Sequence, residues 1–160
     1  RAGAPVISPD GKRLALPQRT ILLVTIASGA AIDTGIACGP LLAWSADGQK
    51  IASLTDNEVH VHDLATKQRT HRLVGHRGTV GSMAWSPDGR SLAVGCDDST
   101  LLFWHLATSR PTAEVELHGG AFSLGFSDDG SCLVAGTMKG YRILRTRPFG
   151  GRLSSEQPRK

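Results

Sequence analysis

The sequence predicts an all-β fold built from repeated, four-stranded antiparallel sheets. Two observations lead to this prediction: a short turn motif recurs along the chain, and alternating apolar runs lie on both sides of each copy. The copies are Ser8–Gly11, Ser45–Gly48, Ser86–Gly89 and Ser127–Gly130, and their aspartates lie 37, 41 and 41 residues apart. Composition agrees, because 19 glycines and only 5% aromatic residues among 160 suit short strands and tight turns better than long helices.

Each Ser-x-Asp-Gly motif has the composition of a hairpin turn. Proline in the second position presets φ, the aspartate bonds its own backbone, and glycine accepts a positive φ. An aromatic residue precedes three of the copies, and an isoleucine precedes the first; these residues are Trp44, Trp85, Phe126 and Ile7. Apolar runs on both sides of such a turn predict a β-hairpin in every copy.

The third copy predicts a complete unit of four strands. We expect strands at 80–85, 91–96, 100–105 and 112–117, with turns between them. Four antiparallel strands in about 41 residues is the size of one β-propeller blade. A helical interpretation fails, because no segment keeps a period of 3.6 residues over ten residues without glycine or proline.

The four copies divide the chain into blades at about 5–38, 39–75, 76–118 and 119–147. The first strand of the first blade is expected to be short, and Pro148–Gly151 interrupts the chain where a fourth strand of the last blade would follow. We therefore expect an incomplete ring of about four blades that is a segment of a larger propeller, followed by a disordered polar tail at 148–160. The open blade edges would expose unpaired backbone groups and permit self-association.

Charge and cysteine content narrow the class of protein. The net charge is +4, and seven of the 18 basic residues lie between 139 and 160, where Glu156 is the only acid. A solvated tail accounts for this better than a nucleic-acid site or a membrane surface. No apolar run approaches the length of a membrane-spanning helix. Three cysteines without a paired pattern suit reduced thiols, so we expect a cytoplasmic protein.

Four features of the third copy follow one another in a fixed order. They are Gly75-His76, the turn Ser86–Gly89, the pair Asp97-Asp98, and Phe103-Trp104. With these features the copy resembles a WD repeat (WD40) of the β-propeller family. The resemblance implies a structural hydrogen-bond network of His76, Asp98 and Trp104, although Val94 replaces the family's Ser or Thr. The second copy has His62-Asp63 in place of Trp-Asp, and the fourth lacks the tryptophan.

No set of residues has the spacing of a catalytic or metal site. His60 and His62 point to one face of a predicted strand, but a third ligand at a fixed spacing is missing. Ser123 lies within a predicted strand and no helix follows it, unlike a hydrolase nucleophile. Neither glycine-rich phosphate loop occurs. We therefore expect no enzyme activity, no catalytic residue, no metal and no cofactor.

The loops at one rim of the blades are the candidate functional surface. By resemblance, WD-repeat proteins bind partner proteins or peptides at the rim formed by loops between the second and third strands and between blades. Mixed charge together with a methionine suits peptide recognition. We expect no small-molecule substrate, no nucleic acid and no membrane as partner. The rim residues are Asn57, Glu58, Arg77, Asp97, Ser99, Met138 and Lys139, joined by Arg19.

Two classes of function remain open. The first is a non-catalytic scaffold for protein–protein interaction. The second is an accessory propeller of a larger enzyme, a bacterial protein kinase or a peptidase, whose catalytic domain lies outside this chain. Ser8–Ala15 resembles the propeller repeats attached to peptidases as much as it resembles WD repeats. A catalytic domain upstream in the full-length gene would decide for the second class.

Overall fold

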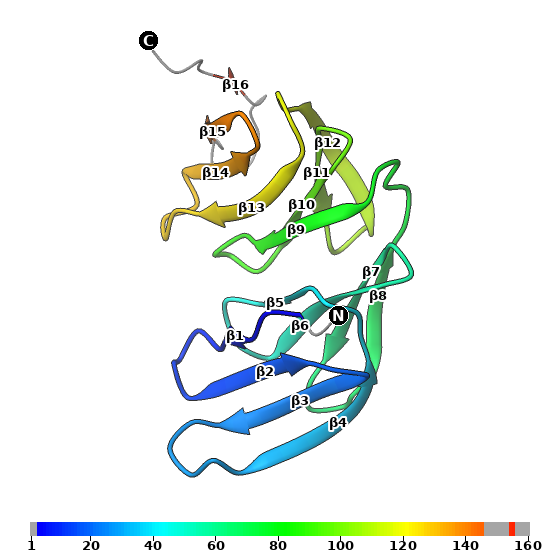
Figure 1. Cartoon of the computed structure of the whole chain (residues 1–160), viewed down its shortest axis with the longest axis vertical. Coiled ribbons are helices and arrows are strands. Elements are labelled where there is room, and N and C mark those ends of the chain that lie inside the picture. The colour runs from blue at the N-terminus through cyan, green and yellow to red at the C-terminus, as the bar shows by residue number, and fades with distance from the viewer. Residues whose placement is uncertain (1–2, 146–153, 156–160) are drawn as a thin grey trace. The chain divides into compact units, whose positions relative to one another are not determined.

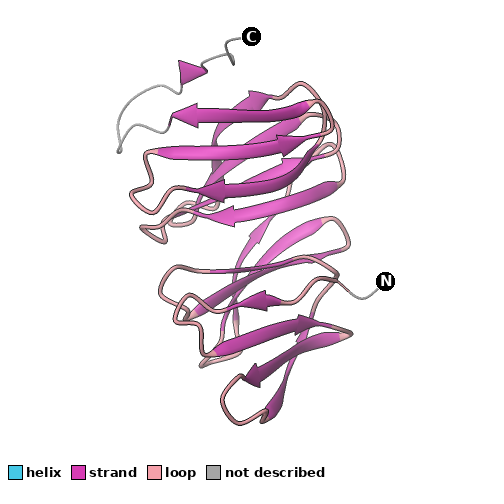
Figure 2. Cartoon of the chain, turned by 60° about the vertical axis from the view of Figure 1, so that its left-hand side comes forward, coloured by secondary structure: helices cyan, strands magenta, loops and turns pink. Residues whose placement is uncertain are grey.

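The described residues of this protein form β-strands and no helices. The computed structural model describes residues 3–145 and 154–155, which contain sixteen strands arranged in four antiparallel sheets of four (Figures 1 and 2). This confirms the predicted all-β class. Within the same residues, no helix has the length and hydrophobicity needed to cross a membrane.

The chain divides into two compact units, Arg1–Gly75 and His76–Lys160, and each contains two sheets. We call the sheets blades 1 to 4 in chain order. Blade 1 consists of β1 (Val6–Ile7), β2 (Arg13–Pro17), β3 (Thr20–Thr25) and β4 (Ala31–Ala37). Blade 2 consists of β5 (Leu42–Trp44), β6 (Lys50–Thr55), β7 (Glu58–Asp63) and β8 (Arg69–Leu73).

The second unit repeats this arrangement. Blade 3 consists of β9 (Val80–Trp85), β10 (Ser91–Cys96), β11 (Thr100–His105) and β12 (Arg110–Glu116). Blade 4 consists of β13 (Ala121–Phe126), β14 (Cys132–Thr137), β15 (Gly140–Arg145) and β16 (Ser154–Ser155). In every blade the strands are neighbours in chain order, so each blade is a simple up-and-down sheet (Figure 1).

The Ser-x-Asp-Gly motifs form the turn between the first and second strands of each blade. In all four copies the serine Oγ donates a hydrogen bond of 2.6 Å to the aspartate Oδ1. The glycine amide donates to the serine carbonyl, and every one of these glycines has a φ between 66° and 70°. The side-chain hydrogen bonds hold the pKa of the Asp129 carboxyl down at about 2, with the Ser127 hydroxyl as the largest cause.

The prediction that the last blade lacks a fourth strand is wrong. The interruption at Pro148–Gly151 suggested that blade 4 lacks a fourth strand, but Ser154 pairs with Arg145 and Ser155 pairs with Leu144. Two consecutive serines carry no apolar alternation, so the sequence offers no signal for this short strand. The rest of the tail predicted at 148–160 lies outside the described residues.

Each blade has two faces, and the central residues of each face lie opposite one another on the first three strands. We call the two sets the front row and the back row. The front rows are Ile7, Leu14 and Val24 in blade 1; Trp44, Ile51 and His62 in blade 2; Trp85, Leu92 and Trp104 in blade 3; and Phe126, Leu133 and Leu144 in blade 4. Each back-row residue is the sequence neighbour of a front-row residue, and its side chain lies on the opposite face of the blade. They are Val6, Ala15 and Leu23; Ala43, Ala52 and Val61; Ala84, Ala93 and Phe103; and Gly125, Val134 and Ile143.

The same pair of rows packs together in both units. In the first unit the back row of blade 1 shares an apolar cluster with Trp44 and Ile51 from the front row of blade 2. In the second unit the back row of blade 3 shares a cluster with the whole front row of blade 4. The core of each unit is therefore one contact between a back row and a front row.

Polar contacts fix this packing in the first unit. The Trp44 indole Nε1 donates to the carbonyl of Val6 at 3.1 Å. The Arg13 guanidinium lies 5.0 Å from the centroid of the Trp44 ring, and its Nη2 donates to the carbonyl of Gly48 at 3.0 Å. Arg13 therefore contributes a cation–π contact as well as a hydrogen bond to the junction of blades 1 and 2.

In the second unit a glycine permits the close approach of blades 3 and 4. A Cβ on Gly95 would lie 2.4 Å from the Cβ of Ala121 and 2.9 Å from the Oγ of Ser82. That hydroxyl is itself buried and donates to the carbonyl of Ala121 at 2.9 Å. A side chain at position 95 would therefore push the two blades apart.

This close approach predicts that Gly95→Ala lowers the free energy of unfolding by about 1–3 kcal/mol, the usual cost of overpacking a core. Urea denaturation followed by circular dichroism measures the difference. Gly125→Ala is the matched control, because Gly125 also lies in a strand and its added Cβ would meet nothing within 4 Å. Equal stability of the two variants would contradict the packing described here.

Candidate functional site

The predicted rim residues lie in turns and loops, or at the adjoining strand ends, of all four blades. Asn57 and Glu58 are in the first unit, where Asp56 and Asn57 form a two-residue turn between β6 and β7 with φ values of 50° and 62°. Such positive φ values are typical of tight type I′ hairpins. The other five rim residues belong to the second unit and lie in the loop before β9 or in the turns that follow β10 and β14: Arg77, Asp97, Ser99, Met138 and Lys139. Arg19 lies in the β2–β3 turn.

Glu58 is engaged by its own sheet. Its carboxylate accepts hydrogen bonds from Arg72, whose Nε lies 2.6 Å from Oε2 and whose Nη2 contacts Oε1. His60 Nε2 lies 3.0 Å from the same Oε2. Hydrogen bonds from Arg72 first, and from His60 second, lower the pKa of Glu58 to about 2. The charge of Glu58 is therefore compensated within blade 2 and is not free to attract a partner.

The two histidines of β7 lie on one face, as the alternation of a strand requires. Their ring centroids are 6.2 Å apart in an edge-to-face arrangement. His62 is buried, and neither its Nδ1 nor the buried Oγ of Ser53 has a hydrogen-bond partner. Burial, followed by the nearby His60 and Arg69, lowers the pKa of His62, so this imidazole is neutral at pH 7. In the described part of the chain, no three His, Cys, Asp or Glu side chains are grouped to hold a metal ion.

The residues of the predicted network meet only in part. The rings of His76 and Trp104 contact each other, with centroids 5.5 Å apart and planes tilted by 48°. Three buried nitrogen atoms of these rings have no hydrogen-bond partner: Nδ1 and Nε2 of His76, and Nε1 of Trp104. Asp98 instead accepts hydrogen bonds from the amide and the hydroxyl of Thr100, at 3.0 and 2.6 Å. The ring contact is thus present without the hydrogen bonds of the predicted network.

Asp97 and Asp98 hold the turn after β10 against the loop before β9. Asp97 Oδ1 accepts a hydrogen bond of 2.7 Å from the amide of Thr79. A Cβ on Gly78 would lie 2.6 Å from the Cγ of Asp98, so only glycine allows this loop to approach the turn. The sequence predicts that Asp97 lies at the rim and that Asp98 belongs to the hydrogen-bond network. Through these contacts both acids also have a local structural role.

The structure adds Phe122 to the rim, a residue that sequence reasoning placed in an ordinary strand. The register of β13 shifts between Ala121 and Ser123, and this irregularity leaves the Phe122 side chain 52% exposed. A Cβ on Gly120 would lie 3.1 Å from the Cζ of Phe122 and 2.9 Å from the carbonyl oxygen of Asp97. Phe122 therefore lies beside the turn after β10. Regular alternation along β13 would point the Phe122 side chain to the opposite face, so only the register shift identifies Phe122 as part of the rim.

Met138 continues the same surface. Its side chain is 83% exposed at the turn between β14 and β15, and a Cβ on Gly119 would lie 3.7 Å from its backbone nitrogen. The two glycines between Leu117 and Ala121 thus separate Met138 from Phe122 without covering either side chain. We call this surface the rim patch; it comprises Asp97, Gly119, Gly120, Phe122 and Met138.

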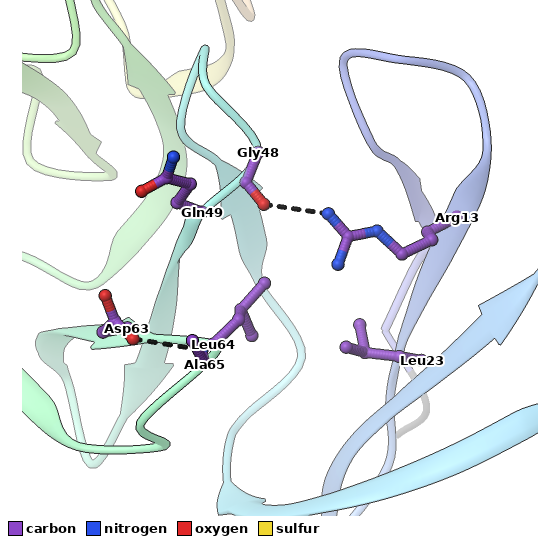
Figure 3. Close-up of a pocket in the computed structure, with 7 residues that line it drawn as sticks. All are labelled: Arg13, Leu23, Gly48, Gln49, Asp63, Leu64 and Ala65. Atoms are coloured by element: carbon purple, nitrogen blue, oxygen red, sulfur yellow. Dashed lines mark hydrogen bonds between the residues drawn. The ribbon is translucent and has the colours of Figure 1, made fainter.

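A cleft of about 270 Å³ lies in the first unit (Figure 3). It is lined by Arg13, Leu23, Gly48, Gln49, Asp63, Leu64 and Ala65. Arg13 donates to the Gly48 carbonyl, and the Asp63 carboxylate accepts from the amide of Ala65 at 3.0 Å (Figure 3). Both charged groups are engaged by the walls of the cleft, so they do not offer the convergent polar groups that orient a ligand.

In the comparison with known protein families, one segment of the chain matches a family model. Residues 67–105, which run from the end of blade 2 through the third strand of blade 3, match the family model of the WD domain, G-beta repeat. No curated protein matches the chain. The matched segment contains His76, Asp98 and Trp104, the three residues on which the sequence resemblance rests.

The absence of hydrogen bonds at His76 generates a prediction. His76→Phe should leave the free energy of unfolding within about 0.5 kcal/mol of the original value, because the ring contact with Trp104 persists and two buried, unpaired nitrogens are removed. His76→Ala, the matched comparison, loses the ring and should be the less stable variant. Urea denaturation measures both. A loss of about 1–3 kcal/mol in His76→Phe would instead show that the hydrogen-bond network forms in solution.

Proposed function

We propose, on the premise that this chain carries a WD40 repeat among four blade-like sheets, that it is a non-catalytic module that binds a peptide segment of a partner protein. WD40 domains are in general protein-interaction modules without catalytic activity. The proposal places the binding surface at the rim patch of the second unit. The observation that carries it is the exposure of Phe122 beside the Asp97 turn and of Met138 beside Gly119.

The composition of the rim patch supports peptide binding. Aromatic residues and methionine are enriched at protein interfaces. A few residues of an interface usually supply most of its binding free energy. Met138 is flexible and adapts to the shape of an apolar partner side chain. The glycines at 119 and 120 have no side chains, so a peptide backbone can approach the surface between Phe122 and Met138.

The partner segment that fits this surface carries at least one apolar side chain and a basic residue. The apolar side chain would contact Phe122 and Met138. The basic residue would lie near Asp97 and Asp98, which are both exposed although each also supports the local turn. Lys139 and Arg77, exposed at the same hairpin ends, would favour an acidic residue elsewhere in the segment.

The second candidate function, an accessory propeller of a bacterial protein kinase or a peptidase, uses the same surface. In that case the rim patch would hold a substrate or a regulatory segment for a catalytic domain encoded beside this chain. The resemblance of Ser8–Ala15 to peptidase-type propeller repeats favours it. The gene around this segment distinguishes the two functions, since a scaffold requires no linked catalytic domain.

A peptide-library selection on the purified chain tests the proposed surface. Binding of a selected peptide, measured by isothermal titration calorimetry, should weaken about tenfold in Phe122→Ala, which corresponds to about 1.4 kcal/mol. Met138→Ala should weaken it in the same direction. Ile32→Ala is the control, because the exposure of Ile32 lies between those of Phe122 and Met138 and Ile32 lies on β4 of blade 1.

Two results would contradict this proposal. The first is a selection that yields no binding peptide. The second is a set of peptides whose affinity falls as much in Ile32→Ala as in Phe122→Ala.

A further inference from the structure

The front face of blade 2 contains buried polar groups that the packing of the first unit does not satisfy. Ser53, on β6, is fully buried, and His62, on β7, is 8% exposed. The Oγ of Ser53 and the Nδ1 of His62 have no hydrogen-bond partner. Both side chains lie on one face, because Ile51 is paired with His62 and Ser53 follows Ile51 by two residues. A buried polar group without a partner costs free energy, so these residues do not stabilise the face on which they lie.

His62 lies at the contact between blades 1 and 2. It belongs to the front row of blade 2, the row that packs on blade 1. Ile51, opposite it, and Leu64, two residues further along the chain, both pack in the apolar cluster of the first unit. The Trp44 indole of the same row donates across the contact to the Val6 carbonyl. A change in the charge of His62 would therefore act on the contact itself.

The charged groups of blade 2 around His62 are mainly cationic. Arg69 is paired with it on β8, and His60 lies on the same face of β7 with its ring centroid 6.2 Å away. The strands β5 and β6 present no ionisable side chain on this face. Glu58 is the acid of this face, and it accepts hydrogen bonds from Arg72 and contacts His60. Its charge is therefore already compensated.

Blade 1 does not supply the missing negative charge. Its strands carry two charged residues, Arg13 on β2 and Asp33 on β4. Arg13 is a cation that bridges to blade 2, and the Asp33 carboxylate interacts electrostatically with Lys67. The Cys38 thiol, which packs against the apolar cluster, stays neutral because burial raises its pKa. A proton added to His62 would therefore create a buried cation beside other cations, a costly arrangement in an apolar contact.

We propose that His62 is an acid-sensitive switch of the first unit: when its imidazole takes up a proton, the contact between blades 1 and 2 opens. At neutral pH the ring is uncharged, because burial first, and the charges of His60 and Arg69 second, lower its pKa from the ordinary value of 6.5. In the open form the ring is hydrated and has its ordinary pKa, so the open form binds the proton more tightly. The closed form is therefore fully favoured above about pH 6.5 and loses up to about tenfold in population ratio per pH unit below it.

The second unit offers a comparison within the same chain. Burial also lowers the pKa of His76, but there the negative charge of Asp98 opposes the effect of burial. His76 also precedes β9 and is not part of the rows that join blades 3 and 4. We therefore expect acid to open the first unit at a higher pH than it affects the second.

The indole N–H resonances of the ¹⁵N-labelled chain test the switch in a titration from about pH 7.5 to about pH 5. Trp44 reports on the first unit, and Trp85 reports on the second. The Trp44 resonance should be replaced by that of a solvent-exposed indole, with an open-to-closed ratio that rises up to about tenfold per pH unit, while the Trp85 resonance stays unchanged. In His62→Phe, which keeps a buried ring that cannot be protonated, Trp44 should not respond.

His71→Phe is the matched control, because His71 is paired with Val61 and lies on the opposite face of blade 2. It should respond to acid as the unaltered chain does. Circular dichroism checks the fold of each variant, and His62→Leu replaces His62→Phe if that variant is unfolded. A Trp44 resonance that is constant over the titration of the unaltered chain would overturn the proposal. So would an unaltered acid response in the folded His62 variant, or loss of the Trp85 signal at the same pH as that of Trp44, which would indicate unfolding of the whole chain.

Discussion

The central strands of the blades carry mostly apolar side chains on both faces, and this constraint governs the rest of the structure. A sheet of four short strands has no interior of its own, so its side chains leave water only when another sheet covers them. Within each unit, that cover is the contact between a back row and a front row. The Gly95 backbone and the Arg13 side chain act on this contact, one by allowing close approach and the other by bridging the blades.

The same constraint explains why function is expected at the hairpin ends. Inside each unit the central rows of two blade faces are used for packing, and the two inner strands of every blade are paired on both edges. Phe122, near the start of β13, and Met138, in the turn between β14 and β15, remain accessible at these ends. Several charged residues at the same ends are engaged locally: Glu58 binds Arg72, and Asp97 binds the Thr79 amide. Apolar exposure consequently identifies the rim patch better than charge does.

The sequence was sufficient to predict the hairpins, because Ser-x-Asp-Gly encodes its turn through local hydrogen bonds that need no distant contact. It was insufficient where tertiary context decides. The two serines of β16 carry no pattern, the shift in β13 that exposes Phe122 depends on pairing with β14, and Thr100 competes for the carboxylate assigned to the His76 network. The division of the rim residues between two units likewise depends on which blades pack together.

The central claim is that the stability of each unit depends on the contact between the back row of one blade and the front row of the next. The urea midpoint of unfolding of Ala93→Asp tests this claim most directly, because Ala93 is fully buried in the contact between blades 3 and 4. A carboxylate at this position would lie among apolar side chains, so the midpoint should fall well below that of Val134→Asp, the same kind of change at the equivalent but exposed position of blade 4. Equal midpoints for the two variants would contradict the account.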